Sequence, residues 1–275
     1  MIVDHLTTDG LRVEIIDSIA ILTLTQPHRG NPLPPGSADQ FKAIWDEVKT
    51  NLAIRAAVVT AEGDRHFCTG ADVSALKTGE DGQPGLQNVP LEQAVRVSPY
   101  QNRVLKPVIA AVNGLVNGGG HHLVADADII VASRNAAFMD THVNVGQVGA
   151  IENIGLAKRL PLGTVLRMTL QGKSFRLSAE RAFELGLVDE LVDGPSDVLP
   201  KALEIAHEVA KNSPQAVALS KQAIWSSLET PYSQACEFGW SLIRNQWSHP
   251  DFIEGPKAFA EKREPIWTPD PNARR

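Results

Sequence analysis

The stretch from Lys106 to Ser133, KPVIAAVNGLVNGGGHHLVADADIIVAS, combines a β-branched apolar run with three consecutive glycines. The segment Val108–Val112 predicts a buried strand, and Asn113-Gly114 predicts a turn. The glycines then open a second apolar segment, where the lack of Cβ atoms lets a backbone approach a ligand closely. Free N–H groups at a helix N-terminus favour negative charge, and two histidines follow at once. We therefore predict an active site that stabilises an oxyanion beside proton-transfer groups.

Composition narrows the class of protein. The 275 residues are 43% hydrophobic and 21% charged, as in an ordinary globular protein. The formal net charge of −6 argues against a general nucleic-acid binder. No run approaches the ~18 apolar residues of a membrane span, and the start MIVDHLTTDG lacks the features of a signal or transit peptide. Cys68 and Cys236 form no disulfide or zinc pattern. We expect a cytoplasmic protein that binds neither nucleic acid nor membrane.

Short strands alternating with helices predict an α/β core. The predicted strands are a hairpin at 11–25 that turns near Asp17-Ser18, then 56–60, 108–112, 129–132, 137–139 and 187–192. The predicted helices are 38–50, 91–105, 151–160, 164–171 and 178 to about 186. From Val198 onward the pattern is helical, which places a boundary near residue 195 between a core (1–195) and a C-terminal region (196–275). Residues 78–90, rich in glycine and proline, predict a mobile loop over a site.

Four motifs occur in one order along the chain: Phe67–Val73 (FCTGADV), Lys106–Gly114 (KPVIAAVNG) with Gly118–Gly120, Leu177–Ala182 (LSAERA) with Gly186–Val188, and Phe259–Arg263 (FAEKR). On these motifs the chain resembles the crotonase (enoyl-CoA hydratase/isomerase) superfamily over nearly its whole length. The resemblance implies a catalytic core of ββα turns wound as a spiral. It also implies a helical C-terminal region that assembles homotrimers, often paired into hexamers.

The chemistry implied by the resemblance is stabilisation of an enolate formed from an acyl-CoA thioester. By motif position, the backbone N–H groups of Ala71 and Gly119 bind the thioester oxygen. Such preorganised donors are typically worth ~3 kcal/mol apiece. Coenzyme A enters only as part of the substrate. No metal or redox cofactor is implied, because the glycine run is not GxGxxG after a first strand and the sequence holds no Cys/His cluster.

The resemblance also implies residues that contact coenzyme A. Backbone around His28–Asn31, which includes Arg29 and Gly30, and around Ala71–Val73, which includes Asp72, holds the pantetheine and adenine parts. Phe259 and Lys262 match a pair that reaches the nucleotide part in a neighbouring subunit. Arg29 either meets a phosphate or is simply solvated, and Asp72 is interpreted as ordering its loop.

The sequence departs from the family pattern at two catalytic positions. A hydratase of this family carries two glutamates; here the first position is His122, and the second falls at or next to His142. Imidazole titrates near neutrality and can act as base or acid. His121 and His122 point about 100° apart on a helix, and motif position favours His122. His142 is either catalytic or a structural hydrogen-bonding group.

Two carboxylates are candidates to assist a histidine. Asp140 lies two residues before His142, which in a strand would place both on one face. Glu152 lies at a predicted helix start, where its alternative role is a first-turn acid facing the helix dipole.

The first functional hypothesis is an enoyl-CoA hydratase-like lyase, because the coenzyme A motifs are present at both ends of the chain. The second is a hydrolase that cleaves a C–C bond in a β-dicarbonyl or cyclic keto-acyl-CoA, since β-diketone hydrolases of this superfamily pair a histidine with a carboxylate in this region. The third is a homologue that binds acyl-CoA without turning it over.

Overall fold

The computed structural model describes residues 3–34, 36–72 and 88–274, and its core is built on two sheets. The larger sheet has the order β1-β2-β3-β5-β7-β10. Its strands are β1 (Leu11–Ile16), β2 (Ile19–Leu24), β3 (Ala56–Ala61), β5 (Val108–Val112), β7 (Ile129–Ser133) and β10 (Glu190–Val192). The β1–β2 pair is antiparallel and every other pair in this sheet is parallel. The predicted hairpin is confirmed, because Asp17 and Ser18 form its turn with φ of 46° and 68°.

The smaller sheet has the order β4-β6-β8-β9. Its strands are β4 (His66–Cys68), β6 (Leu115–Asn117), β8 (Ala137–Met139) and β9 (Leu177–Ser178). A strand of the larger sheet is followed by one of the smaller sheet three times along the chain: β3 then β4, β5 then β6, and β7 then β8. This repetition is the predicted spiral of ββα turns, and it brings the residues that follow β4, β6 and β8 to one end of the molecule.

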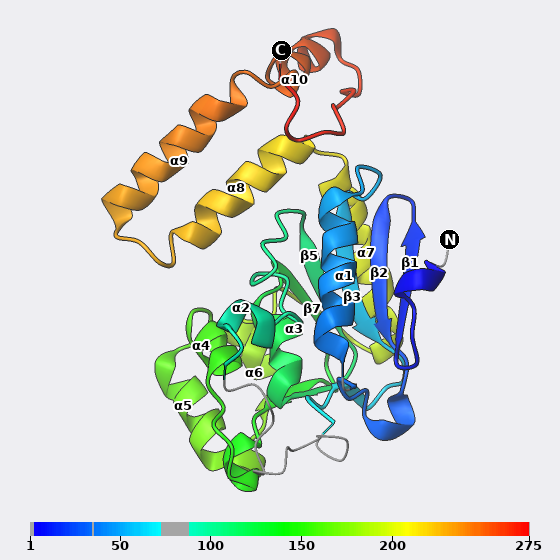
Figure 1. Cartoon of the computed structure of the whole chain (residues 1–275), viewed down its shortest axis with the longest axis vertical. Helices are drawn as coiled ribbons and strands as arrows, with labels where there is room; N and C mark the ends of the chain where they lie inside the picture. The colour runs from blue at the N-terminus through cyan, green and yellow to red at the C-terminus, as the bar shows by residue number, and fades with distance from the viewer. Residues whose placement is uncertain (1–2, 35, 73–87, 275) are drawn as a thin grey trace.

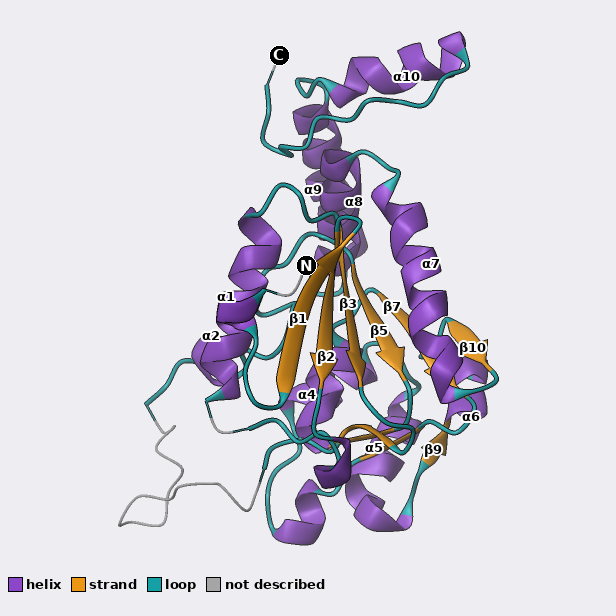
Figure 2. Cartoon of the chain, turned by 90° about the vertical axis from the view of Figure 1, so that its right-hand side faces the viewer, coloured by secondary structure: helices purple, strands orange, loops and turns teal. Residues whose placement is uncertain are grey.

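Helices cover both faces of the larger sheet, as Figure 2 shows with α1 on one side and α7 on the other. Their bounds are α1 (Ser37–Thr50), α2 (Leu91–Ala94), α3 (His122–Ala125), α4 (Ile151–Ala157), α5 (Leu162–Gln171), α6 (Ala179–Glu184) and α7 (Val198–Ala210). Successive strand side chains alternate between the faces. Thus Leu22 belongs to the core on the α1 side, and Ile21 belongs to the core on the α7 side.

The last helices lie apart from this core. They are α8 (Pro214–Ser226), α9 (Tyr232–Gln246) and α10 (Asp251–Glu261). Figure 1 shows α8 and α9 side by side, extending away from the sheets. No residue of α9 is buried, and it exposes Phe238, Trp240 and Ile243. The trimer or hexamer and the domain boundary near residue 195 stay predictions. None of the described helices is long and apolar enough to cross a membrane.

The predicted helix over 91–105 is wrong beyond Ala94. Trp45 Nε1 donates to the Val97 carbonyl at 2.9 Å, so that carbonyl faces the core rather than a helical partner. Pro99 has no N–H to continue a helix, and Asn102 Nδ2 donates to the Ser98 carbonyl at 2.8 Å. A side chain therefore takes the place of a helical donor at Val97, whereas the Ser98 carbonyl accepts both the side chain and, at 3.3 Å, the backbone N–H of Asn102.

The last strand begins later than predicted. Leu187 and Val188 both donate their backbone N–H to the Ala182 carbonyl, at 2.9 and 3.3 Å, and so close the end of α6. Only Glu190–Val192 pairs with β7. Most of the predicted loop over 78–90 lies outside the described residues.

Candidate active site

Two glycine-containing loops meet beyond the ends of β4 and β6. After β6 the three glycines form a 3-10 helix, η4 (Gly118–His121), which leads directly into α3. A Cβ built on Gly70, in the loop after β4, would lie only 2.9 Å from the Gly119 nitrogen. The lack of a side chain at Gly70 therefore allows the two backbones to touch.

The backbone of Ala71 is oriented by Leu33. The Leu33 N–H donates to the Gly70 carbonyl at 2.8 Å, and the Leu33 carbonyl accepts from the Asp72 N–H at 3.1 Å. Because both bonds face Leu33, the N–H of Ala71, between them, points the other way. A Cβ built on Gly119 would lie 3.7 Å from the Ala71 nitrogen. The two predicted oxyanion donors therefore lie side by side on neighbouring loops.

A pocket of about 490 Å³ opens at this place. Its wall includes Arg29, Ala71, Gly119, Thr141 and His142. Asn117 Nδ2 lies 2.9 Å from Thr141 Oγ1 and 3.3 Å from the Thr69 carbonyl, so one amide side chain ties the loops together. The structure thus brings a predicted proton-transfer group to the same pocket as both predicted oxyanion donors.

His142 is held by Asp140 through two hydrogen bonds. Asp140 Oδ1 accepts the backbone N–H of His142 at 2.8 Å and lies 2.7 Å from its Nδ1. The predicted pairing occurs, but the reason given for it is wrong: β8 ends at Met139, and His142 begins a 3-10 helix, η5 (His142–Val145). A turn rather than a shared strand face brings the two side chains together.

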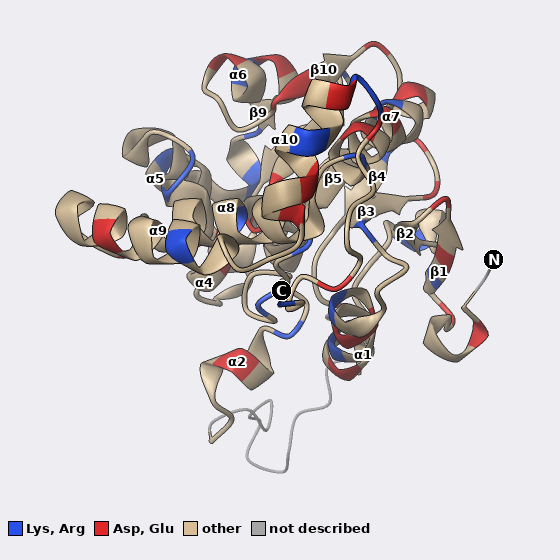
Figure 3. Cartoon of the chain, turned by 90° about the horizontal axis from the view of Figure 1, so that it is seen from above, with Lys and Arg blue, Asp and Glu red and all other residues tan. Residues whose placement is uncertain are grey.

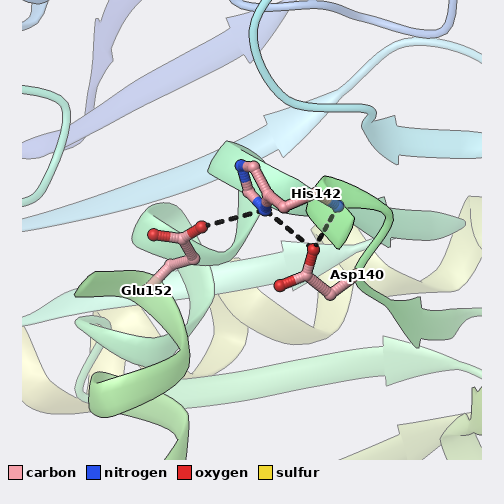
Figure 4. A group of neighbouring side chains, drawn as sticks. All are labelled: Asp140, His142 and Glu152. Carbon is pink, nitrogen blue, oxygen red and sulfur yellow. Dashed lines mark hydrogen bonds and ion pairs between the residues drawn. The ribbon is translucent and has the colours of Figure 1, made fainter. Parts of the chain in front are cut away.

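Glu152, from α4, completes the cluster drawn in Figure 4. Its Oε1 lies 3.2 Å from His142 Nδ1, and its Oε2 lies 3.7 Å from His122 Nε2. In Figure 4 both carboxylates approach the same ring nitrogen of His142, and the other ring nitrogen points away from them. The wall of the pocket includes His142 but not His122 or Glu152, whose side chains are only 12% and 8% exposed.

The environments of the two predicted catalytic histidines shift their pKa values in opposite directions. The hydrogen bond to Asp140 raises the pKa of His142, and burial opposes that rise. Burial, with smaller contributions from the neighbouring His121 and His142, lowers the pKa of His122 to about 4. At neutral pH His122 is therefore uncharged, whereas His142 titrates above the usual pKa of an imidazole, ~6.5.

The two carboxylates also differ. Burial acts to raise the pKa of Asp140, but hydrogen bonds from His142 and Asn153 outweigh it and hold the pKa at about 2. Burial raises the pKa of Glu152. Because Asp140 is ionised and cannot donate, the proton between Asp140 and His142 resides on Nδ1. In the uncharged form of His142, the lone pair of Nε2 is then free to accept a proton.

Three features of the cluster were not predicted from the sequence. Asn153 donates to Asp140 Oδ2, and a Cβ built on Gly149 would overlap that same carboxylate oxygen. His121 is fully buried, with Nε2 2.8 Å from the Met139 carbonyl, and therefore supports the loop from inside. Asn153 directly follows a predicted site residue on a helix, which is the one sequence signal that pointed to it.

Asp140, His142 and Glu152 also offer metal-ligand atoms within 4.8 Å of one another. The hydrogen bond between Asp140 and His142 already accounts for their close approach. The absence of a metal from the working site stays a prediction.

The residues predicted to contact coenzyme A are spread over two regions. Arg29, in η2 (Pro27–Arg29), lies on the pocket wall, and its Nη2 is 2.5 Å from Asp72 Oδ2. Gly30 has φ of 84° and packs against Thr69. Val73 lies outside the described residues.

Phe259, 88% exposed, and Lys262 lie at the end of α10, at the far end of the molecule from α4 in Figure 1. Their reach into a neighbouring subunit stays a prediction.

Fold and site together define an α/β enzyme scaffold with main-chain anion donors beside a histidine–carboxylate cluster. A family model described as enoyl-CoA hydratase/isomerase matches residues 14–270, so the chain belongs to this family.

Curated relatives and solved structures agree with that membership. The chain is 32% identical to an (E)-benzylidenesuccinyl-CoA hydratase from Thauera aromatica, over 93% of this chain and 97% of the relative. It is 30% identical to a carnitinyl-CoA dehydratase from Proteus mirabilis, over 96% and 97% of the two chains. An enoyl-CoA hydratase/isomerase structure from Mycobacterium paratuberculosis superposes with a TM-score of 0.85 at 35% identity, covering 96% of this chain and 100% of that one.

Proposed function

We propose that this protein adds water reversibly to the double bond of a 2-enoyl-CoA thioester, with His142 as the group that moves the proton. The single observation that carries the proposal is the position of His142: its Nδ1 is engaged by Asp140, and its ring lies on the pocket wall that also contains Ala71 and Gly119. Relatives whose names describe hydration and dehydration of acyl-CoA compounds support this reaction class.

The steps follow from the protonation states. Water in the pocket gives a proton to His142 Nε2 as its oxygen bonds to the β-carbon of the substrate. The electron pair of the double bond moves toward the thioester, and the N–H groups of Ala71 and Gly119 bind the enolate oxygen. His142 then returns a proton, from Nε2, to the α-carbon. General acid–base catalysis of this kind contributes typically 10²–10⁴-fold.

In this proposal the carboxylates and His122 position the catalytic imidazole. Asp140 fixes the Nδ1–H tautomer and stabilises the imidazolium that forms during water attack. Glu152 adds a second acceptor at 3.2 Å from the same nitrogen. His122, uncharged and nearly buried, contacts Glu152 from the protein interior. The histidine at the first family position, His122, therefore supports the position of Glu152 and does not transfer a proton.

A second candidate reaction is hydrolysis of a C–C bond in a β-dicarbonyl acyl-CoA. It is favoured by the ionised, buried Asp140 behind His142, since a histidine oriented by a carboxylate activates a nucleophile for attack on a carbonyl. Water would bond to the ketone carbon and lose its proton to His142. The C–C bond would break toward the thioester, giving a carboxylic acid and the same enolate.

The deciding experiment is mass spectrometry of acyl-CoA compounds incubated with the pure protein. The panel holds 2-enoyl-CoAs of several chain lengths and one cyclic β-keto-acyl-CoA. Addition of 18 Da to an enoyl-CoA, lost in His142→Gln, supports the hydratase. Ring opening of the keto compound alone supports the hydrolase. No turnover of any compound, with ligand-induced thermal stabilisation, would contradict both and leave a binding protein.

A further inference from the structure

A second pocket lies at the opposite end of the larger sheet from His142. Ile54 and Arg55 on its wall precede β3, and Lys106 and Pro107 precede β5. The candidate active site lies beyond the other ends of the strands in this core. Six residues of β3 at ~3.3 Å each place the two sites roughly 20 Å apart. The second pocket, which we call the basic pocket, has a volume of about 280 Å³.

The basic pocket concentrates positive charge, and the acids that act on it, Asp251 on Arg55 and Glu47 on Lys106, lie outside its wall. Its wall holds five basic residues, which are Lys49, Arg55, Arg103, Lys106 and Arg274. Lys49 pairs with Asp46. Within the described part of the chain, the other four form no ion pair, and no Asp or Glu lines the pocket. Figure 3 looks onto this end of the molecule and shows several basic segments around the C-terminus.

Backbone contacts fix the turn that carries Arg103 and anchor the ammonium of Lys106. Arg103 adopts φ of 55°, a left-handed conformation uncommon for a residue with a side chain. Its N–H bonds to the Tyr100 carbonyl at 2.8 Å, which fixes the turn. Lys106 Nζ donates to the Asn51 carbonyl at 2.7 Å, so its ammonium is anchored by a neutral partner.

The charge around Lys106 is unfavourable without a ligand. Burial and, to a smaller extent, Arg55 lower the pKa of Lys106 to about 8, against the opposing effect of Glu47 on α1. Lys49, Arg103 and Arg274 share the pocket wall with it, whereas Lys221, whose Nζ donates to the Lys106 carbonyl, has its charge matched by Asp128 at 2.6 Å. A bound anion would lower the free energy of this cluster by supplying the missing negative charge.

Besides the basic residues, the wall holds the amides Asn212, Gln215, Asn245 and Asn272 and a larger set of apolar side chains. Ile54, Val217 and Leu219 lie beside the cations, and prolines from the start of α8 and the C-terminal segment complete the enclosure. A free inorganic ion would leave these side chains without a partner. An anion that carries a short hydrocarbon part would contact both kinds of surface.

We propose that the basic pocket binds a small organic carboxylate, with its charge among Arg55, Arg103 and Lys106 and its hydrocarbon part against the aliphatic wall. The volume is at the lower limit for small-molecule sites, ~300 Å³, and fits a compound of about the size of hexanoate. Binding here would not require the reaction at His142.

Titration calorimetry of the full chain with hexanoate, and separately with inorganic phosphate, tests the proposal. We expect one hexanoate per chain, at least tenfold weaker binding in both Arg103→Gln and Lys106→Gln, and unchanged binding in Arg65→Gln. Arg65 is an exposed arginine outside this pocket, so its removal matches the change in charge. Circular dichroism confirms that each variant is folded; because Arg103 is exposed, its variant remains informative if Lys106→Gln fails to fold.

A proton measurement provides an independent readout. At pH 8 a lysine of pKa about 8 is about half protonated, so anion binding should take up roughly half a proton per site. This uptake appears as a dependence of the observed heat on the ionisation enthalpy of the buffer. Affinity retained within twofold in both variants, no binding at 10 mM, or equal binding of phosphate and hexanoate would each overturn the proposal.

Discussion

The carboxylate of Asp140 accepts the backbone N–H of His142 at 2.8 Å and contacts its Nδ1 at 2.7 Å, so a single oxygen fixes both the main chain and the ring of the histidine. The geometry makes the protonation of His142 depend on the charge of Asp140. It also leaves Nε2 as the nitrogen that can exchange protons with a substrate.

Replacement of Asp140 by Asn keeps an acceptor oxygen but removes its charge. In the parent protein, protonation of His142 sets the acid limb of kcat/KM above pH ~6.5, because Asp140 raises the pKa of the imidazole. The acid limb of kcat/KM should therefore move to lower pH in Asp140→Asn, while the maximal rate falls by about 10²-fold or more. A pH–rate profile of both proteins checks this, and an unmoved limb would contradict the role given to Asp140.

Gly149 permits the close approach of α4 to Asp140. A Cβ at this position would overlap Asp140 Oδ2 and lie 3.0 Å from His142 Nδ1. Gly149→Ala should therefore lower activity by at least tenfold through displacement of the pair. Gly163→Ala is the matched control, because a Cβ there meets nothing within 4 Å. Equal activity of the two variants would show that the cluster tolerates the added methyl group.

Gly119 and Gly120 are adjacent but should respond differently to alanine. A Cβ at Gly119 makes only ordinary contacts, 3.6 Å from Leu33 Cδ1 and 3.7 Å from the Ala71 nitrogen, whereas one at Gly120 would lie 2.7 Å from the Cys68 carbonyl oxygen. We expect Gly119→Ala to fold normally and lose about 10²-fold in kcat, because the methyl group occupies space beside the oxyanion donors.

Gly120→Ala should instead lower the melting temperature, because backbone must move to admit the methyl group. Thermal unfolding and steady-state kinetics of both variants separate the two effects. A stable Gly119→Ala protein with full activity would exclude this pair of N–H groups as the oxyanion site.

The buried His122 should make stability depend on pH. Its folded pKa of about 4 lies below the unfolded value of ~6.5, so the unfolded chain binds the extra proton between these values. The contribution to stability is present above pH 6.5 and is lost as the pH falls toward 4. Between pH 7 and pH 5, protonation linked to His122 should lower the free energy of unfolding by about 2 kcal/mol.

Urea unfolding at the two pH values measures that cost. His122→Gln should reduce the loss of unfolding free energy on acidification by about the same 2 kcal/mol. His5→Gln, at an exposed position, serves as the control and should leave the loss unchanged. A parent protein whose stability does not change over this range would show that His122 is charged or accessible in the folded state.

The core was predictable because its signals are local. Apolar β-branched runs predicted β3, β5 and β7, and the alternating pattern of residues 11–25 predicted the first hairpin with its turn near Asp17-Ser18. Short strands alternating with helices indicated an α/β core, and only the family resemblance implied the spiral. The two oxyanion donors were placed by motif position, and the structure brings them together at the pocket.

The rest depended on contacts between distant parts of the chain. The segment after Ala94 leaves the helix because Trp45, far away in sequence, takes the Val97 carbonyl. The roles of Gly149 and Asn153 arise from the way α4 packs against the turn after β8, which no spacing in the sequence records. Glu152 was a candidate, but its distance to both histidines could not be derived from the pattern.

The main-chain origin of the two predicted oxyanion donors has a consequence for how function can change in this scaffold. Side-chain substitutions around the pocket leave the N–H groups of Ala71 and Gly119 where Leu33 and the glycine turn hold them. A few substitutions on η5 and α4 can therefore change the reaction. The N–H groups of Ala71 and Gly119 stay in place after each of these substitutions. For chains of this kind, the glycine motif identifies the ancestry, and the histidines and carboxylates beside it identify the reaction.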